Sequence, residues 1–440
     1  MKLLLKNALV LTGDLLTPIW QDVHIGIEDE QFALIVEADN PDAGKLVADF
    51  NADRVLSAHD KIIMPGLINC HTHIGMSLMR NYGSDLNLQD WLTQKIFPVE
   101  ANLTPDDIHW ANLLEQSELI RSGCTGYVDM YYFPEIGAKN ALNSGMRANI
   151  SVPITGAAVD SQKSYSMATE ALEQFNKDWS GRDNRLSVSA VVHSTYLPTW
   201  DALVEIGEFV SSKQFPTHIH LHETMKEIAD SLEQYQKRPI QIASELGILN
   251  NRTVVAHGVH LTDEDRSLLK KHDVLVAHCP TSNLKLASGV ADMESLWQKE
   301  IRIGLGTDGA SSNNNLNMFE ELHLAALLEK GFKMDPLLMP AVRMVHIATQ
   351  QAATALNQNP LLGHFVVGAP ADLIMLSRNE PHWFPLTDPV AAVVYSAQAA
   401  DVDTVMVAGK ILMEKRQMMT IDMEQAKWQV NRAQKRLLDF

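Results

Sequence analysis

Eight short apolar runs, separated by longer stretches with helical spacing, constrain the fold of this chain more than any other feature. The runs lie at 61–71, 125–130, 147–154, 186–194, 216–223, 253–260, 274–280 and 301–309. Most lack the polar alternation of a strand with one solvated face, which is typical of parallel strands covered on both sides. Eight strand–helix units predict an α/β fold, a (β/α)8 TIM barrel.

The two ends of the chain carry a different pattern. Residues 22–36 alternate polar and apolar side chains, and residues from about 365 hold further strand-like runs, such as 405–416 with a Gly-containing turn. The closing residues 423–440 have the spacing of a helix. Since neither end has enough strands for a stable sheet alone, we expect the two ends to pair with each other.

This pattern divides the chain into three segments. A chain of 440 residues is too long for one ordinary core. Residues 1–60 and 365–440 are predicted to form one small β-sandwich-like domain with a terminal helix. Residues 61–364 are predicted to form the barrel.

Composition excludes several classes of function. The net charge of −18 argues against a nucleic-acid backbone or an anionic membrane as partner, and no apolar run reaches the ~18 residues of a membrane span. Cys70, Cys124 and Cys279 are too few and too scattered for a disulfide framework. We therefore expect a cytoplasmic protein.

Histidines and one aspartate lie where the predicted strands end, which is where barrel enzymes carry their chemistry. These residues are His71, His73, His193, His218, His220, His222, His257, His260, His278 and Asp308. Residues i and i+2 of a strand share a face, so His71 and His73 emerge together, as would the three histidines of the fifth run. Such a set suits a divalent metal. A single strand-end histidine is more often a hydrogen-bonded structural residue, which is the interpretation favoured for His218, His260 and His278.

Several motifs carry a resemblance to a known family. "PGLINCHTH", "HIHLHET", "AHGVHL", "HCPTSNLKLASG" and "GLGTDGASSNN" resemble those of the amidohydrolase superfamily. More narrowly they are similar to its 5′-methylthioadenosine/S-adenosylhomocysteine deaminase-like branch, which includes chlorohydrolase and triazine-hydrolase relatives. The match also covers "DWLTQKIFPVE", "VDMYYF" and "GAPADLIML", and so extends over nearly the whole chain.

The resemblance implies a metal site. His71, His73, His220 and Asp308 would hold one divalent ion, and His257 would contact the attacking water. The family places a ligand three residues before its catalytic glutamate, which selects His220 with Glu223. An aromatic residue often stands in the family where this chain has His222, so the role of His222 stays open, with a spare ligand as one alternative.

A single metal ion is expected, because binuclear branches of the superfamily use a carboxylated lysine on a middle strand and the second, third and fourth runs contain no lysine. Zinc is favoured because nitrogen and oxygen ligands with one open position suit it. Iron, manganese or nickel would accept the same set.

The resemblance also implies a mechanism and substrate contacts. Asp308 would take the proton of the water, His257 would hold the nucleophile in line, and Glu223 would protonate the ring nitrogen and then the departing ammonia. Glu100 aligns with the family acid that takes ribose hydroxyls, and His193 with a base- or sugar-contacting histidine. Trp91 is expected to wall the pocket, with ordinary packing as its alternative, and a solvated helix-start carboxylate is the alternative for Glu100.

The end of the third run bears on the substrate's 5′ group. Family members that accept S-adenosylhomocysteine tend to place an arginine there, and Val152 stands at that position by an ungapped count. Residues 153–162 supply no arginine or lysine. We therefore expect a preference for a small uncharged 5′ group beside Val152, unless Arg80 or Lys285 reaches into the mouth.

The sequence thus predicts a metal-dependent hydrolytic deaminase of an adenine nucleoside (5′-methylthioadenosine, adenosine or S-adenosylhomocysteine) that forms the inosine analogue and ammonia. The nearest alternative is the same scaffold hydrolysing guanine, a pterin, a triazine or a cyclic amide. A catalytically inactive barrel used for assembly is a third reading, which the intact ligand set and Glu223 argue against. Barrels of this family are often oligomeric, so a homo-oligomer is expected.

Overall fold

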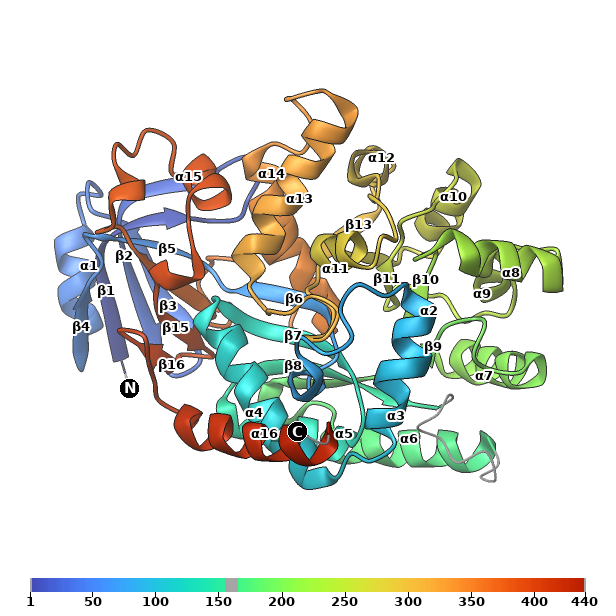
Figure 1. Cartoon of the computed structure of the whole chain (residues 1–440). Coiled ribbons are helices and arrows are strands. Elements are labelled where there is room, and N and C mark those ends of the chain that lie inside the picture. The colour runs from blue at the N-terminus through green and yellow to red at the C-terminus, as the bar shows by residue number, and fades with distance from the viewer. Residues whose placement is uncertain (1, 155–164, 439–440) are drawn as a thin grey trace.

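Two sheets dominate the structure, which is a computed structural model that describes residues 2–154 and 165–438. One is an eight-stranded parallel sheet and the other is a nine-stranded mixed sheet. In Figure 1 the mixed sheet lies on the left, and the helices α4 to α14 surround the parallel sheet. The expected fold, a (β/α)8 barrel with a small β domain, is confirmed.

The barrel strands follow one another in sequence order, each parallel to the next. They are β6 (Leu67–Thr72), β7 (Cys124–Met130), β8 (Arg147–Pro153), β9 (Leu186–His193), β10 (Thr217–Leu221), β11 (Val254–His257), β12 (Leu275–His278) and β13 (Arg302–Leu305). The chain beyond β13 bonds back to β6, through the Asp308 N–H to the His71 carbonyl at 3.0 Å. This contact brings the last predicted strand end beside the first.

The first predicted run holds two strands rather than one. β5 (Lys61–Pro65) pairs with the second sheet, and the chain crosses to the barrel at Gly66. A Cβ at Gly66 would lie 2.1 Å from the Thr125 side chain, so only glycine fits this close approach. We therefore propose to place the boundary between the two parts after Pro65 rather than at residue 60.

Helices cover the outside of the barrel. They are α4 (Pro105–Arg121), α5 (Pro134–Ser144), α6 (Tyr165–Trp179), α7 (Trp200–Lys213), α8 (Met225–Tyr235), α9 (Pro239–Glu245), α10 (Asp263–Lys271), α11 (Pro280–Lys285), α12 (Met293–Gln298), α13 (Met318–Lys333) and α14 (Ala341–His346). Most begin at a residue whose side chain accepts a backbone N–H, as Thr104 does for α4 in a reciprocal pair with Asp107. Their apolar faces and the outward residues of the strands form the largest buried cluster.

The second sheet joins the two ends of the chain. Its other strands are β1 (Lys2–Leu11), β2 (Ile19–Glu28), β3 (Gln31–Glu37), β4 (Arg54–Ser57), β14 (Leu373–Ser377), β15 (Val402–Val407), β16 (Lys410–Glu414) and β17 (Gln417–Met418). The N- and C-terminal segments meet where β5 runs antiparallel to β14. A buried ion pair between Arg147 of the barrel and Asp372, 2.6 Å apart, ties this sheet to the base of β8.

The remaining helices flank these sheets or the barrel mouth. α1 (Ala43–Phe50) and α15 (Pro389–Tyr395) belong to the terminal segments, and α16 (Met423–Leu437) packs along α4. The segment of α2 (Leu88–Trp91), a π-helical turn at Leu92–Ile96 and α3 (Phe97–Glu100) lies at the mouth. Within the described residues, no helix has the length and apolar character needed to cross a membrane.

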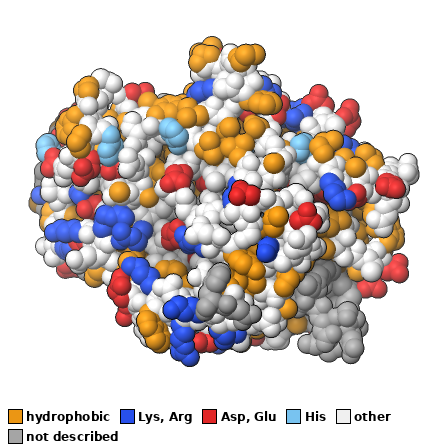
Figure 2. All heavy atoms as spheres, in the orientation of Figure 1, with side chains coloured by type: hydrophobic (Ala, Val, Ile, Leu, Met, Phe, Trp, Pro, Cys, Tyr) orange, Lys and Arg blue, Asp and Glu red, His pale blue; other side chains and the backbone are white. Residues whose placement is uncertain are grey.

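The surface carries charges of both signs with scattered apolar groups (Figure 2). Hydrophobic side chains gather at the top of this view, where α13 ends and a turn leads to α14. Phe332, Met334 and Leu337 are exposed there.

Candidate active site

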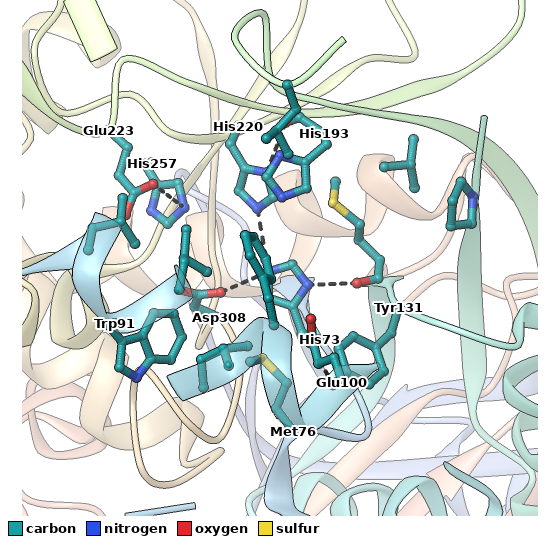
Figure 3. Close-up of a pocket in the computed structure, with 18 of the residues that line it drawn as sticks. His73, Met76, Trp91, Glu100, Tyr131, His193, His220, Glu223, His257 and Asp308 are labelled. Carbon is teal, nitrogen blue, oxygen red and sulfur yellow. Dashed lines mark hydrogen bonds and ion pairs between the residues drawn. The ribbon is translucent and has the colours of Figure 1, made fainter. Parts of the chain in front are cut away.

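A cavity of about 180 Å³ opens at the C-terminal ends of the barrel strands. Its lining includes eight of the nine site residues predicted from the sequence, namely His73, Trp91, Glu100, His193, His220, Glu223, His257 and Asp308. Figure 3 shows Glu223 and His257 on one side, His220 and His193 on another, and Trp91 and Met76 across from them. Only His71 lies beneath the cavity, fully buried.

Five side chains present ligand atoms to one point. Two overlapping sets, His71 with His220 and His257, and His71 with His73 and Asp308, have all their ligand atoms within 4.8 Å of one another. The Oδ1 of Asp308 lies 3.3 Å from Nε2 of His71 and 3.1 Å from Nε2 of His73. The Nε2 of His71 is buried and lacks a hydrogen-bond partner. Four imidazoles and a carboxylate, with the Nε2 of His71 among them unsatisfied, fit a divalent metal ion.

Each predicted imidazole ligand is oriented by its other nitrogen. Nδ1 of His71 lies 2.8 Å from Nε2 of His218, Nδ1 of His73 lies 2.6 Å from the Met130 carbonyl, and Nδ1 of His220 lies 2.9 Å from the His193 carbonyl. These contacts direct all three Nε2 atoms toward the common point. Such outer contacts fix the tautomer and the ring orientation of metal ligands.

Asp308 is held in the same way. Its Oδ2 accepts hydrogen bonds from Ser282 Oγ at 2.6 Å and from Ser312 Oγ at 2.8 Å, which leaves Oδ1 facing the imidazoles. Burial acts to raise the pKa of Asp308, but the adjacent imidazoles of His71 and His73 outweigh it and hold this pKa well below its ordinary value. Asp308 is therefore an anion in this setting, as a ligand must be.

Glu223 and His257 lie next to each other on one side of the cavity (Figure 3). Nδ1 of His257 lies 2.9 Å from Oδ1 of Asn283, so Nδ1 carries the proton and Nε2 is free to accept one. That Nε2 lies 3.8 Å from Oε2 of Glu223. Burial raises the pKa of Glu223, and the nearby His257 opposes this rise. A carboxyl group with a raised pKa is suited to donate and accept protons near neutral pH.

Glu100 presents a hydrogen-bonded carboxyl group to the cavity. Glu100 accepts hydrogen bonds from the hydroxyl groups of Tyr131 at 2.9 Å and Tyr132 at 3.3 Å. Burial raises the pKa of Glu100, against the effect of these bonds. Trp91 is buried in the adjoining wall, and Nδ1 of His193 is buried without a partner. The alternative of a solvated Glu100 disagrees with these contacts, whereas Trp91 both lines the cavity and packs in an apolar cluster.

His222 does not share the face of His218 and His220, contrary to the expectation from strand alternation. β10 ends at Leu221, and His222 has a left-handed backbone with φ of 58°. Its ring is turned away from the metal ligands, with Nδ1 3.1 Å from the His260 carbonyl and Nε2 accepting the Ile240 N–H at 3.2 Å. Both nitrogens are engaged, so the spare-ligand alternative is wrong.

The contacts of His260 and His218 fit the interpretation as hydrogen-bonded structural residues, whereas Nδ1 of His278 is buried without a hydrogen-bond partner. Nε2 of His260 lies 2.7 Å from the Ser288 carbonyl. Burial lowers the pKa of His278 to about 3, so its imidazole is neutral. His218 is placed between His71 and the hydroxyl of Ser151, 3.1 Å from Nδ1, and so supports a predicted ligand.

Val152 lies on the opposite side of its strand from the cavity. It packs in the cluster between the barrel and its helices, and the neighbouring Pro153 lines the cavity instead. The expectation that the substrate's 5′ group lies beside Val152 is therefore wrong, because neighbouring residues of a strand face opposite sides. The predicted absence of a cation at 153–162 falls mainly on residues 155–162, which lie outside the described residues.

The two cations considered as substitutes are engaged elsewhere. Arg80 is paired with Glu118 at 2.6 Å, and Lys285 donates to the Ser311 carbonyl at 2.9 Å and to Asn314. Among the residues that the structure describes, no lysine or arginine lines the cavity. Much of the lining is apolar.

Sequence reasoning missed the residues that orient the site. Asn283 holds His257, and Ser282 and Ser312 hold Asp308. All three lie within motifs used for the resemblance, "HCPTSNLKLASG" and "GLGTDGASSNN", so the signal was their spacing from His278 and Asp308.

Comparison with known proteins agrees with this geometry. The amidohydrolase family model matches residues 62–412. A protein of Acetivibrio thermocellus named 5-methylthioadenosine/S-adenosylhomocysteine deaminase is 42% identical over 438 residues, which is 100% of both chains. An adenosine deaminase structure from Xanthomonas campestris with bound zinc superposes with a TM-score of 0.93 at 29% identity, over 100% of this chain and 99% of that one. A guanine deaminase of C. acetobutylicum, at 19% identity and a TM-score of 0.82 over 93% of this chain and 100% of its own, shows the fold alone.

Proposed function

This chain belongs to the amidohydrolase family, and we propose that it is a metal-dependent deaminase that hydrolyses the C–NH₂ bond of the adenine ring in a nucleoside. One observation carries the proposal. A single cavity brings together a metal-ligand set, a buried Glu223 3.8 Å from His257, and a partly buried Glu100.

One divalent metal ion per chain, most simply zinc, is part of the proposal. His71, His73, His220 and Asp308 would hold it, and the zinc in the adenosine deaminase structure of Xanthomonas campestris supports this choice of ion. The ion would supply Lewis-acid activation of the attacking water. Iron, manganese and nickel accept the same ligands and are distinguished by elemental analysis.

The protein side chains divide the proton transfers between them. Asp308 takes the proton of the attacking water, since its Oδ1 faces the ligand set and its pKa is low enough to keep it ionised beforehand. His257, with Nδ1–H fixed by Asn283, accepts a hydrogen bond from the water through Nε2 and aligns it with the ring carbon.

Glu223 transfers protons to the ring nitrogen and to the leaving amino group. Attack at the C–NH₂ carbon places electron density on the adjacent ring nitrogen, and a protonated Glu223 supplies a proton there. The Glu223 carboxylate then takes the proton of the hydroxyl group that attack has placed on the same carbon and passes it to the amino group, which departs as ammonia. The proton that Asp308 took from the water restores the protonated Glu223. Burial raises the pKa of Glu223, so it holds a proton at higher pH than an ordinary glutamate.

Glu100, His193 and Trp91 would bind the nucleoside. A carboxylate that already accepts two tyrosine hydroxyls still has lone pairs for a pair of sugar hydroxyls. His193 offers its unpartnered Nδ1 to the base or the sugar. Trp91 supplies an apolar wall.

Ammonia release from a panel of compounds tests the proposal. Adenosine, 5′-methylthioadenosine and S-adenosylhomocysteine represent the proposed class, and guanine, a pterin, a triazine and a cyclic amide represent the alternative. We expect the nucleosides to be deaminated and the others to react slowly or not at all. If a compound of the second group is the best substrate, the proposed substrate class is wrong, and the proposed scaffold and metal site are unaffected.

Self-association and a cytoplasmic location complete the proposal. The exposed Phe332, Met334 and Leu337 support an apolar contact between copies of the chain. The three cysteines, all buried and free, suit a reducing compartment. Sedimentation analysis of the purified protein and fractionation of producing cells test these two points.

A further inference from the structure

We propose that His222 is a positioning residue that sets Glu223 beside His257 by tying the end of β10 to the loop after β11. The inference rests on the proposed role of Glu223 as the proton carrier. His222 itself lines no part of the cavity, and its contacts are all with protein groups.

The side chain of His222 joins two neighbouring segments. Nε2 accepts the N–H of Ile240, near the start of α9. With Nε2 an acceptor, Nδ1 carries the proton and donates it to the His260 carbonyl at 3.1 Å. That carbonyl also accepts from Nη2 of Arg238 at 2.7 Å, and the same Nη2 lies 3.2 Å from Nδ1.

The main chain of His222 makes three more bonds to the same surroundings. Its carbonyl accepts the N–H groups of Val259 at 3.0 Å and His260 at 3.1 Å, both in the loop that follows His257. Its own N–H donates to Oε1 of Glu227 at 3.1 Å, and Oε2 of that glutamate accepts the N–H of Glu223 at 2.8 Å. Every polar atom of His222 is therefore engaged, and its Nδ1 and its carbonyl bond to the loop that follows His257.

These bonds control the spacing of the two catalytic side chains. Glu223 follows His222 directly, and His257 precedes the bonded residues 259 and 260. The left-handed φ of His222, 58°, is uncommon for residues with a side chain, although histidine adopts it more often than most, and the bonds described above hold it here. Loss of the ring bonds would let the two segments move apart, and a displacement of about 1 Å costs ~10²-fold in rate.

Three variants separate the ring's hydrogen bonds from its bulk. His222→Phe fills the space with an aromatic ring that makes neither bond. His222→Asn keeps a donor near the position of Nδ1 and tolerates the left-handed backbone. His222→Gln keeps an acceptor near the position of Nε2. His272→Gln is the control, because it changes a half-buried histidine bonded to Ser244 of α9, outside the site.

The measurements are kcat and KM for 5′-methylthioadenosine, metal content, and hydrogen exchange of the backbone amides. We expect the Phe variant to lose kcat by ~10²-fold with little change in KM and in metal content, and the Asn and Gln variants each to recover part of the loss. In the Phe variant, the backbone amides of Ile240, Val259 and His260 should exchange faster than in the unaltered protein. The control should match the unaltered protein in every measurement.

An unchanged kcat together with unchanged exchange in the Phe variant would overturn the inference. Equal losses of kcat in the Phe, Asn and Gln variants would assign the effect to the shape of the side chain rather than to its hydrogen bonds. This result would also overturn the inference. If the Phe variant does not fold, the Asn and Gln variants decide by the same measures. If the unaltered protein deaminates no nucleoside, the proposed function fails, and the exchange pattern still decides whether His222 ties the two segments.

Discussion

Nδ1 of His257 and Oδ1 of Asn283 lie 2.9 Å apart, in the buried interior between the end of β11 and the start of α11. Asn283 accepts the proton of Nδ1, and its own Nδ2 has no hydrogen-bond partner. The contact fixes which nitrogen of His257 faces the cavity, so the catalytic use of His257 depends on a residue that does not line it.

Replacing Asn283 with Leu should lower kcat by about 10- to 100-fold while the metal is retained, because His257 loses the partner that fixes its tautomer. Asn283→Asp is the matched control, since it keeps the oxygen that accepts the Nδ1 proton and changes only the unpartnered nitrogen. Steady-state kinetics with metal analysis of both variants makes the comparison. Equal kcat in the Leu and Asp variants would remove Asn283 from the mechanism.

Replacing Glu223 with Gln should leave one metal ion per chain and lower kcat by ~10²–10⁴-fold, because the amide keeps the size of the side chain but cannot carry a proton. Elemental analysis and steady-state kinetics on the same preparation measure both quantities. Activity near that of the unaltered protein would exclude Glu223 as the proton carrier.

His220→Ala and His222→Ala should differ in metal content. The first removes an imidazole whose Nε2 points to the ligand set, and the second removes a ring bonded to Ile240 and His260. We expect the metal to be lost only from the His220 variant, as measured by elemental analysis after dialysis. The opposite result would mean that the ligand assignment is shifted by two residues.

Substrate preference should follow the charge of the 5′ group. Among the described residues the cavity wall has no cation, so the carboxylate of S-adenosylhomocysteine would enter without a partner, which is costly. We expect kcat/KM to be higher for 5′-methylthioadenosine and adenosine than for S-adenosylhomocysteine. If S-adenosylhomocysteine is the best of the three, a cation must reach the mouth from a part of the chain other than Arg80 and Lys285.

The stability of the protein should depend on pH through Glu321. Burial raises the pKa of this carboxyl to about 7, against hydrogen bonds from Thr281 and Asn313. Between pH 4.5 and 7 the unfolded chain has released this proton while the folded chain still holds it, so rising pH lowers the free energy of unfolding. Glu321→Gln removes this contribution.

The difference in free energy of unfolding, variant minus unaltered protein, should therefore increase with pH by up to ~3 kcal/mol across this window and level off above it. Urea unfolding of both proteins in the presence of a chelator, at several pH values, gives this difference without the contribution of a bound metal. A difference that stays constant from pH 4.5 to 8 would show that Glu321 titrates normally.

The barrel was predictable because its signals are local. Each apolar run is bounded by polar residues, and His71 at the end of β6 and His73 just beyond it place their rings 4.8 Å apart, in agreement with their spacing. The sequence predicted that the two ends of the chain pair with each other, since neither end has enough strands for a sheet. The crossing at Gly66, where the chain leaves β5 of the second sheet for the barrel, could not be predicted, because Gly66 lies inside one continuous apolar run.

The errors arise where backbone geometry departs from the strand pattern. His222 follows His218 and His220 at the same spacing, but its left-handed backbone comes after the last strand residue and redirects the ring. Nothing in "HIHLHET" marks the position where the strand ends. Val152 and Pro153 differ by one position, and sequence counting without the strand pairing does not fix which of them faces the cavity.

The most direct test of the central claim is to follow the products formed from 5′-methylthioadenosine by the metal-loaded protein and by the same protein after chelation. The account predicts one ammonia and one molecule of the inosine analogue per molecule consumed, loss of this activity after chelation, and its return when zinc is added back. Deamination that continues unchanged in metal-free protein, or metal-loaded protein that forms neither product, would contradict it.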